Sequence, residues 1–143
     1  MALNPKFSTG FRNALIDGGD ITTMFNSGEL HIYSGAQPAD ADATEGAGTL
    51  LVTITLPAAN AFAASAVSGQ IAKAGTWSAA TGAGGTAAWF RMYDSAVTTG
   101  ASTTAVRIDG TVDLTTGDLI PNAVALVATD IFIVDTFAIA LAA

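Results

Sequence analysis

The side chains that could perform chemistry are few and widely spaced in this sequence. His31 is the single histidine and there is no cysteine, so neither a multi-histidine nor a cysteine-based metal site can be assembled. His31 stands between Leu30 and Ile32 in a strand-like stretch, where a half-buried or surface position is expected. No Gly-x-Ser-x-Gly motif accompanies it. The sequence therefore gives no support to acyl-transfer catalysis, and we expect a protein that is not an enzyme.

Acidic residues cluster in one predicted loop. Asp40, Asp42 and Glu45 lie as close together as oxygen ligands for calcium do, but the EF-hand spacing, with its glycine and closing glutamate, is absent. Asp109 and Asp113 flank a strand end. We expect all five carboxylates to be solvated and no metal to be bound. The glycine-rich stretches contain neither Gly-Lys-Ser/Thr nor Gly-x-Gly-x-x-Gly, so no phosphate-binding loop and no cofactor are predicted.

Asp135 is the one carboxylate that the sequence places in an apolar row. The predicted strand 131–141 puts the following side chains on the same face: Ile131, Ile133, Phe137, Ile139 and Leu141. An unpaired buried carboxylate costs several kcal/mol, so we expect Asp135 to meet Arg91, Arg107, Lys73 or backbone N–H groups. Arginine is preferred because its planar fork can satisfy both carboxylate oxygens at once.

Four aromatic residues, Tyr33, Trp77, Trp89 and Tyr93, have the size and polarity to stack on sugars if they are exposed. Side chains of this kind serve more often as core residues or as anchors of a subunit interface. We therefore expect them to be interface aromatics, with carbohydrate binding as the alternative.

The composition narrows the class of protein. The chain has 143 residues, the size of one domain, and only 12% of them are charged, against about 25% in an ordinary globular domain. Its net charge of −7 and its lack of a basic cluster disfavour nucleic acid as a partner. No stretch approaches the roughly 18–20 apolar residues of a membrane span, and the N-terminus lacks the apolar core of a secretory signal. We expect synthesis in the cytoplasm and no membrane partner.

The hydrophobic pattern divides the chain at residue 28. Within 1–28, Ser8 or Thr9 is expected to cap a short helix that ends at Gly18-Gly19, and Asp20 a second one that ends at Gly28. From 29 to 143 the period becomes two, with expected strands at 30–33, 50–56, 71–78, 86–93, 106–112 and 131–141. The stretch 58–68 fits either a helix or irregular extended structure. This pattern predicts a mainly β fold, an antiparallel β-sandwich or jelly roll, preceded by a short helical segment.

Several phrases of the sequence resemble a family of small proteins encoded among the structural genes of tailed bacteriophages. The resemblance spans nearly the whole chain. The phrases that carry it are FSTGFRNALIDGG (7–19), HIYSGAQPA (31–39), WFRMYDSA (89–96), RIDG (107–110) and DTF (135–137).

This resemblance implies a structural protein of the virion. The expected role is that of a capsid decoration or cement protein, a β-rich homotrimer bound to the major capsid protein on the outer surface of the head. A tail or head-fibre component that binds host glycans is the alternative. We further expect segment 1–28 to dock against the sandwich or a neighbouring subunit and to help attach the protein to the capsid. The candidate docking residues are Phe7, Phe11, Leu15, Met24 and Phe25.

Overall fold

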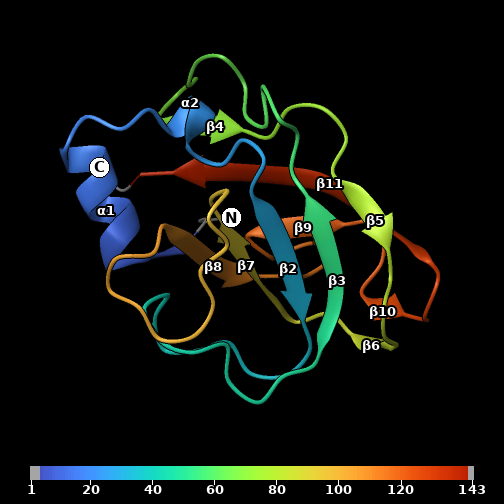
Figure 1. The fold of residues 1–143 in the computed structure, drawn as a ribbon. Helices are drawn as coiled ribbons and strands as arrows, with labels where there is room; N and C mark the ends of the chain where they lie inside the picture. The colour runs from blue at the N-terminus through green and yellow to red at the C-terminus, as the bar shows by residue number, and fades with distance from the viewer. Residues whose placement is uncertain (1–3, 142–143) are drawn as a thin grey trace.

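The computed structural model describes residues 4–141, and its largest element is a five-stranded antiparallel sheet (Figure 1). The strands of this main sheet, in spatial order, are β1 (Lys6–Phe7), β8 (Arg107–Thr111), β7 (Trp89–Tyr93), β2 (Glu29–Tyr33) and β3 (Leu50–Thr55). β2, β3, β7 and β8 correspond to strands that the alternating pattern predicts. The two-residue strand β1 is too short to leave such a pattern.

A second sheet is built around the long strand β11 (Ile131–Ala140). β9 (Leu119–Pro121) pairs with its middle, β5 (Ser78–Ala80) with its first residues and β4 (Gln70–Ala72) with its last residues. A small ladder of β6 (Gly85–Thr86) and β10 (Ala125–Leu126) adjoins it. The expected mainly β architecture is confirmed: strands make up 36% of the described residues and helices 9%.

β4 and β5 form one interrupted strand along β11. The predicted strand 71–78 breaks in its middle, yet the Lys73 N–H donates to the Phe137 carbonyl and the Val134 N–H donates to the Trp77 carbonyl. The break turns the Trp77 side chain into the core, where it is fully buried. The ambiguous stretch 58–68 has irregular structure, held by a β-bridge between Phe62 and Lys73.

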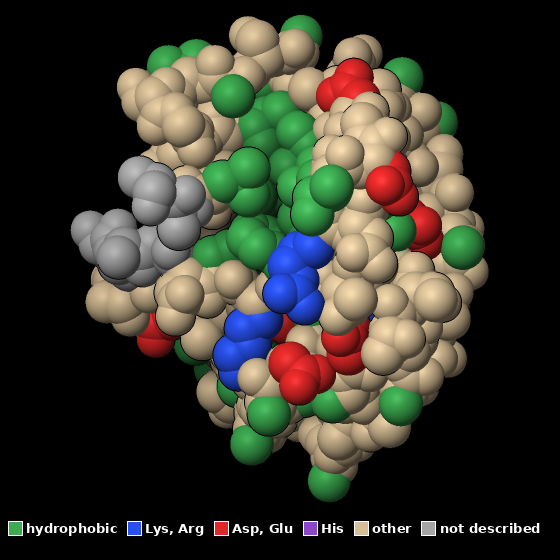
Figure 2. Space-filling view, turned by 90° about the vertical axis from the view of Figure 1, so that its left-hand side faces the viewer, with side chains coloured by type: hydrophobic (Ala, Val, Ile, Leu, Met, Phe, Trp, Pro, Cys, Tyr) green, Lys and Arg blue, Asp and Glu red, His purple; other side chains and the backbone are tan. Residues whose placement is uncertain are grey.

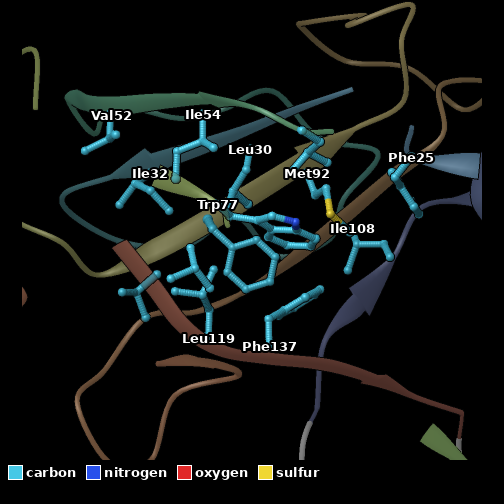
Figure 3. Packing of buried hydrophobic residues seen from close by; sticks show 14 of the residues in the cluster. Phe25, Leu30, Ile32, Val52, Ile54, Trp77, Met92, Ile108, Leu119 and Phe137 are labelled. Atoms are coloured by element: carbon cyan, nitrogen blue, oxygen red, sulfur yellow. The ribbon is translucent and has the colours of Figure 1, made fainter. Parts of the chain in front are cut away.

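The core lies between the two sheets in a sandwich-like arrangement, shown from close by in Figure 3. The main sheet and the second sheet contribute buried side chains as follows: Leu30, Ile32, Val52, Ile54, Phe90, Met92 and Ile108 from the former, and Phe132, Val134, Phe137 and Ile139 from the latter. Phe137 lies at the centre of an aromatic cluster, with ring centroids 5.3 Å from Phe90, 5.7 Å from Trp77 and 6.0 Å from Phe62. These contacts join the two sheets.

Residues 4–28 pack against the sandwich, which is one of the two positions expected for this segment. Ser8 caps α1 (Thr9–Ile16) by accepting a hydrogen bond from the Phe11 N–H, and Asp20 caps α2 (Ile21–Met24). The Ser8 hydroxyl also donates to the Ala105 carbonyl and accepts from the Arg107 N–H, so the cap is tied to β8. Of the candidate docking residues, Phe11 and Phe25 are wholly inside the core, which rules out their role as contacts to a capsid.

The remaining three candidates, Phe7, Leu15 and Met24, pack on the edge of the core and stay partly exposed. α1 and its neighbours form the left side of the molecule in Figure 1. Viewed from that side, hydrophobic side chains gather in a hollow next to Lys and Arg side chains (Figure 2). Within residues 4–141, no helix is long and apolar enough to cross a bilayer.

The expectation that Asp135 is buried is wrong. The register of β11 shifts between Val134 and Thr136, which inserts one residue into the alternation. Before this bulge the inward side chains are Phe132 and Val134, and after it they are Phe137 and Ile139. Asp135 lies at the bulge and is exposed. The prediction assumed an uninterrupted period of two and so assigned the first half of the strand to the wrong face.

We predict that Phe137→Ala destabilises the fold by about 3–5 kcal/mol, because it opens a cavity between two sheets that Phe137 joins. Urea unfolding followed by tryptophan fluorescence measures the change, since Trp77 lies in the same cluster. Leu114→Ala, at a position 48% exposed, is the control and should change the free energy of unfolding little. Equal losses in both variants would contradict the central role of Phe137.

Candidate functional site

The face of the main sheet that points away from the core carries three buried charged side chains, Arg91, Arg107 and Asp109. We call it the polar face and define it by the following side chains: His31 and Tyr33 of β2, Trp89, Arg91 and Tyr93 of β7, and Arg107 and Asp109 of β8. Because side chains alternate along a strand, these residues lie opposite the core residues Ile32, Phe90, Met92 and Ile108. All seven are nonetheless buried.

The centre of the polar face is an ion pair between Arg91 and Asp109. The two residues lie directly opposite each other on β7 and β8. Arg91 Nε donates to Asp109 Oδ1 and Nη2 donates to Oδ2, each at 2.7 Å, and both side chains are 0% exposed. This is the two-pronged arginine–carboxylate contact expected from the sequence, with Asp109 in the place assigned to Asp135.

The charges of this pair depend on each other. Burial raises the pKa of Asp109 above its usual value, and the hydrogen bonds from Arg91 and the positive charges of Arg91, Arg107 and Lys6 only partly oppose that rise. Burial also disfavours the charged form of Arg91, but the hydrogen bonds and charge of Asp109 outweigh it and hold the pKa of Arg91 above its usual value. Asp109 therefore favours the charged form of Arg91, and Arg91 limits the rise in the pKa of Asp109.

A loop covers the polar face. Residues 34–49, which we call the covering loop, connect β2 to β3 and contain the acidic cluster noted in the sequence. Arg91 Nη1 donates to the Ala43 carbonyl at 2.7 Å, and Lys6 Nζ donates to the Pro38 carbonyl at 2.9 Å. The guanidinium that pairs with Asp109 thus also holds the backbone of the loop.

The acids of the covering loop are structural. Glu45 accepts a hydrogen bond from the Tyr93 hydroxyl at 2.8 Å and from the Gly100 N–H at 3.0 Å. Asp42 accepts from the backbone N–H of Thr9 at 2.8 Å and from its hydroxyl at 2.6 Å. The expectation of solvated carboxylates is wrong for Asp42, Glu45 and Asp109, because their local sequence spacing does not reveal partners so distant in the chain.

Aromatic rings lie between the charged groups of the polar face. Tyr33 stacks on Trp89 with ring centroids 4.4 Å apart, and the Arg91 guanidinium carbon lies 5.8 Å from the Trp89 ring centroid. Arg107 is 5.8 Å from the centroid of Tyr93. These distances fall within the range of cation–π contacts, which strengthen when they are removed from water. The polar face is therefore held together by ring contacts as well as by charge.

The expected interface aromatics lie inside the chain. Tyr33, Trp89 and Tyr93 belong to the polar face beneath the covering loop, and Trp77 belongs to the apolar core. Burial raises the pKa of Tyr33 and of Tyr93, so both hydroxyls stay protonated, and that of Tyr93 donates to Glu45. None of the four rings presents a surface on which a sugar could stack, which corrects the expectation that they are exposed anchors.

Both ring nitrogens of His31 lie within reach of polar groups of the same strand. Its Nε2 lies 2.7 Å from Glu29 Oε2, and its Nδ1 lies 3.3 Å from the Tyr33 hydroxyl. The ring packs against Tyr93 at a centroid distance of 4.7 Å. Both ring nitrogens therefore have partners on β2 itself.

Two surface hollows of the molecule are separate from these groups. One of about 240 Å³ lies beside β4, and one of about 260 Å³ lies beside β3 and β5; neither is lined by a titratable side chain. In residues 4–141, no three histidine or acidic side chains gather as they would around a metal ion. No protein-family model, curated protein or solved structure that we compared with the chain matches it.

We expect Arg91→Met and Asp109→Leu each to cost about 3–5 kcal/mol of stability, because each leaves one buried charge without its partner. The double variant should lose less than the sum of the two, since it removes both charges. Urea unfolding of the four proteins gives the coupling energy. Arg12→Met, which removes an exposed arginine of α1, is the control. If the double variant loses as much free energy of unfolding as the two single variants together, the pair does not contribute as proposed.

The acids of the covering loop make its attachment dependent on pH. For Glu45, burial acts to raise the pKa, but hydrogen bonds from Tyr93 and Gly100 and the charge of Arg91 hold it below the usual 4.5. For Asp42, burial is likewise outweighed by the hydrogen bonds from Thr9, and its pKa lies below 3.8. A carboxylate with a lower pKa in the folded state stabilises the fold above its unfolded pKa, and this stabilisation is lost as the pH falls through the folded pKa.

We predict that Glu45→Gln lowers Tm at neutral pH and that the difference from the wild-type protein disappears as the pH falls below the usual pKa of 4.5. Thermal unfolding between neutral and strongly acidic pH tests this. Asp17→Asn, at an exposed carboxylate at the end of α1, serves as the control for removal of one negative charge. A constant difference across the pH range would mean that Glu45 does not hold the loop through its charge.

Proposed function

We propose that the chain is a non-enzymatic structural protein of a tailed-phage virion, a decoration protein bound to the major capsid protein on the outer surface of the head. The observation that carries this proposal is the distribution of side chains. On the buried polar face, Arg91, Asp109 and Tyr93 make their polar contacts within the chain, whereas large apolar side chains are left on the outside. Such a distribution suits a protein whose surface is covered by other subunits. The sequence phrases shared with phage structural proteins agree with it.

The side of the molecule that carries α1 is the proposed contact with the capsid. Ile16, the last residue of α1, is 83% exposed, and Phe7, Leu15 and Met24 are partly exposed near it in the sequence. Figure 2 shows that hydrophobic side chains and Lys or Arg side chains occur together on this side. An apolar centre flanked by charged groups is typical of protein interfaces.

The alternative, a fibre component that binds host glycans, has lost the residues on which it was based. It required exposed aromatic rings, and Tyr33, Trp77, Trp89 and Tyr93 are all buried. A glycan array with the isolated protein remains its direct test.

We predict that antibodies against the chain label the heads of purified particles of the encoding phage, with immunogold electron microscopy as the measurement. Ile16→Asp should lower the number of copies bound to heads, because it places a charge in the proposed contact. Since Ile16 is exposed, the fold of this variant should be unchanged. Leu114→Asp is the matched control, and labelling confined to tails, or no labelling, would refute the proposal.

A further inference from the structure

The second sheet has an outward surface with almost no charge. We call it the outer face and define it by the outward side chains of β11 and those paired with them: Ile131, Ile133, Asp135, Thr136, Ala138 and Ala140, with Gln70, Ala72, Ser78, Ala80 and Ile120. Asp135 is the only charged residue of this set. Because the outward side chains of β4 and β5 are mostly small, the isoleucine side chains of β11 project beyond them.

This face differs from the corresponding face of the main sheet. The polar face is covered by residues 34–49 of the same chain, whereas the outer face keeps Ile131 57% exposed and Ile133 37% exposed. Val67 borders the other end of the face, beside Ala72 and Ala138, and is 73% exposed. Apolar side chains of this size gather on a monomer surface mainly where another molecule binds.

The outer face also contains hollows next to its projecting side chains. The hollow of about 240 Å³ is lined by Val67, Ala72 and Ala138 at one end, among others. The hollow of about 260 Å³ is lined by Leu50, Ala80 and Gly82, among others, at the opposite end. Because Ala80 pairs with Ile131, a projecting side chain and a hollow occur together at both ends. The second hollow lies at the boundary with β3 of the main sheet, whose residues 50–53 supply most of its lining. Each end of the outer face thus combines a projecting side chain with a recess that a second copy can enter.

The charge of the protein identifies the occupant. The net charge is −7, and most exposed acids lie outside the outer face: Asp17 and Asp20 near the helices, Asp40 in the covering loop, Asp113 in the loop beyond β8, and Asp130 at its border, just before Ile131. Two copies that meet through those surfaces would oppose like charges, which is unfavourable. A positively charged partner would bind the surfaces that carry the exposed acids. It would gain little from the outer face, which has almost no charge. The face that matches a nearly uncharged, apolar surface is another copy of the same surface.

We propose that the outer face of the β4–β11–β5 sheet is a contact between copies of this chain. The contact buries Ile131, Ile133 and Val67 against the hollows of the neighbouring copy. Asp135 is then the one group of the face whose charge opposes association, because a carboxylate loses water there. This proposal concerns the purified protein in solution and does not depend on its place in a virion.

The experiment is sedimentation velocity of the purified full chain from micromolar to millimolar concentration. The wild-type protein should form a species heavier than the 14.3 kDa monomer, whether a dimer or a closed ring. Ile133→Lys should weaken the association by at least about tenfold, because it buries an unpaired charge. Asp135→Asn should tighten it several-fold, because it removes the only charge from the face. Leu114→Lys is the control, at a comparably exposed apolar residue outside the face, and should leave it unchanged.

The substituted side chains are all exposed, so circular dichroism should report the same fold for each variant. A wild-type protein that stays monomeric, or association that Ile133→Lys and Asp135→Asn both leave unchanged, would overturn the proposal. Either result would leave the test of virion labelling unaffected, so a failure here is distinct from a failure of the proposed function.

Discussion

The ion pair between Arg91 and Asp109 is the contact on which the arrangement of the main sheet and its covering loop depends. Both side chains are fully buried, and a buried pair of this kind is tolerated only when its remaining donors and acceptors are satisfied. The covering loop supplies those acceptors through the carbonyl of Ala43 and the carboxylate of Glu45. In return, the guanidinium fixes the path of the loop. The pair also fixes the register of β7 and β8, because a slip of one residue would turn Arg91 into the apolar core.

The protein therefore has two sheets with different outer surfaces. The main sheet bears charged and aromatic side chains that lie beneath residues 34–49 and contact other groups of the same chain. The second sheet bears small and branched apolar side chains that its own chain leaves uncovered. This difference between the two sheets accounts for the low content of charged residues in the sequence. Several of the few charges present lie inside, and one whole sheet surface has a single carboxylate.

The sequence predicts local features well, because their causes are local. Ser8 and Asp20 cap the two helices as expected, and the alternating pattern marks β2, β3, β7, β8 and β11. The sequence also predicts a buried contact between an arginine and a carboxylate, but it names Asp135 as the acid instead of Asp109. A single extra residue in β11 moves Asp135 outward, and nothing in the composition of that strand signals the bulge. The one local signal for Asp109 is that it lies two residues after Arg107, on the same face of its strand. That Arg91 lies opposite it on β7 is not visible in the sequence.

The hydroxyl of Ser8 shows how the order of synthesis bears on this fold. It accepts a backbone N–H in the first turn of α1, and the same oxygen bonds to backbone groups of Ala105 and Arg107, which lie 97 and 99 residues further along the chain. The first helix can form briefly on its own, but its cap cannot be completed until the ribosome has released those residues. Closing a loop of this length carries an entropic cost before any contact rewards it, so folding should be slow and should occur late in translation. Until then Phe11 and Phe25, which end in the core, have no sheet to cover them, and the nascent chain is most prone to aggregate during this interval.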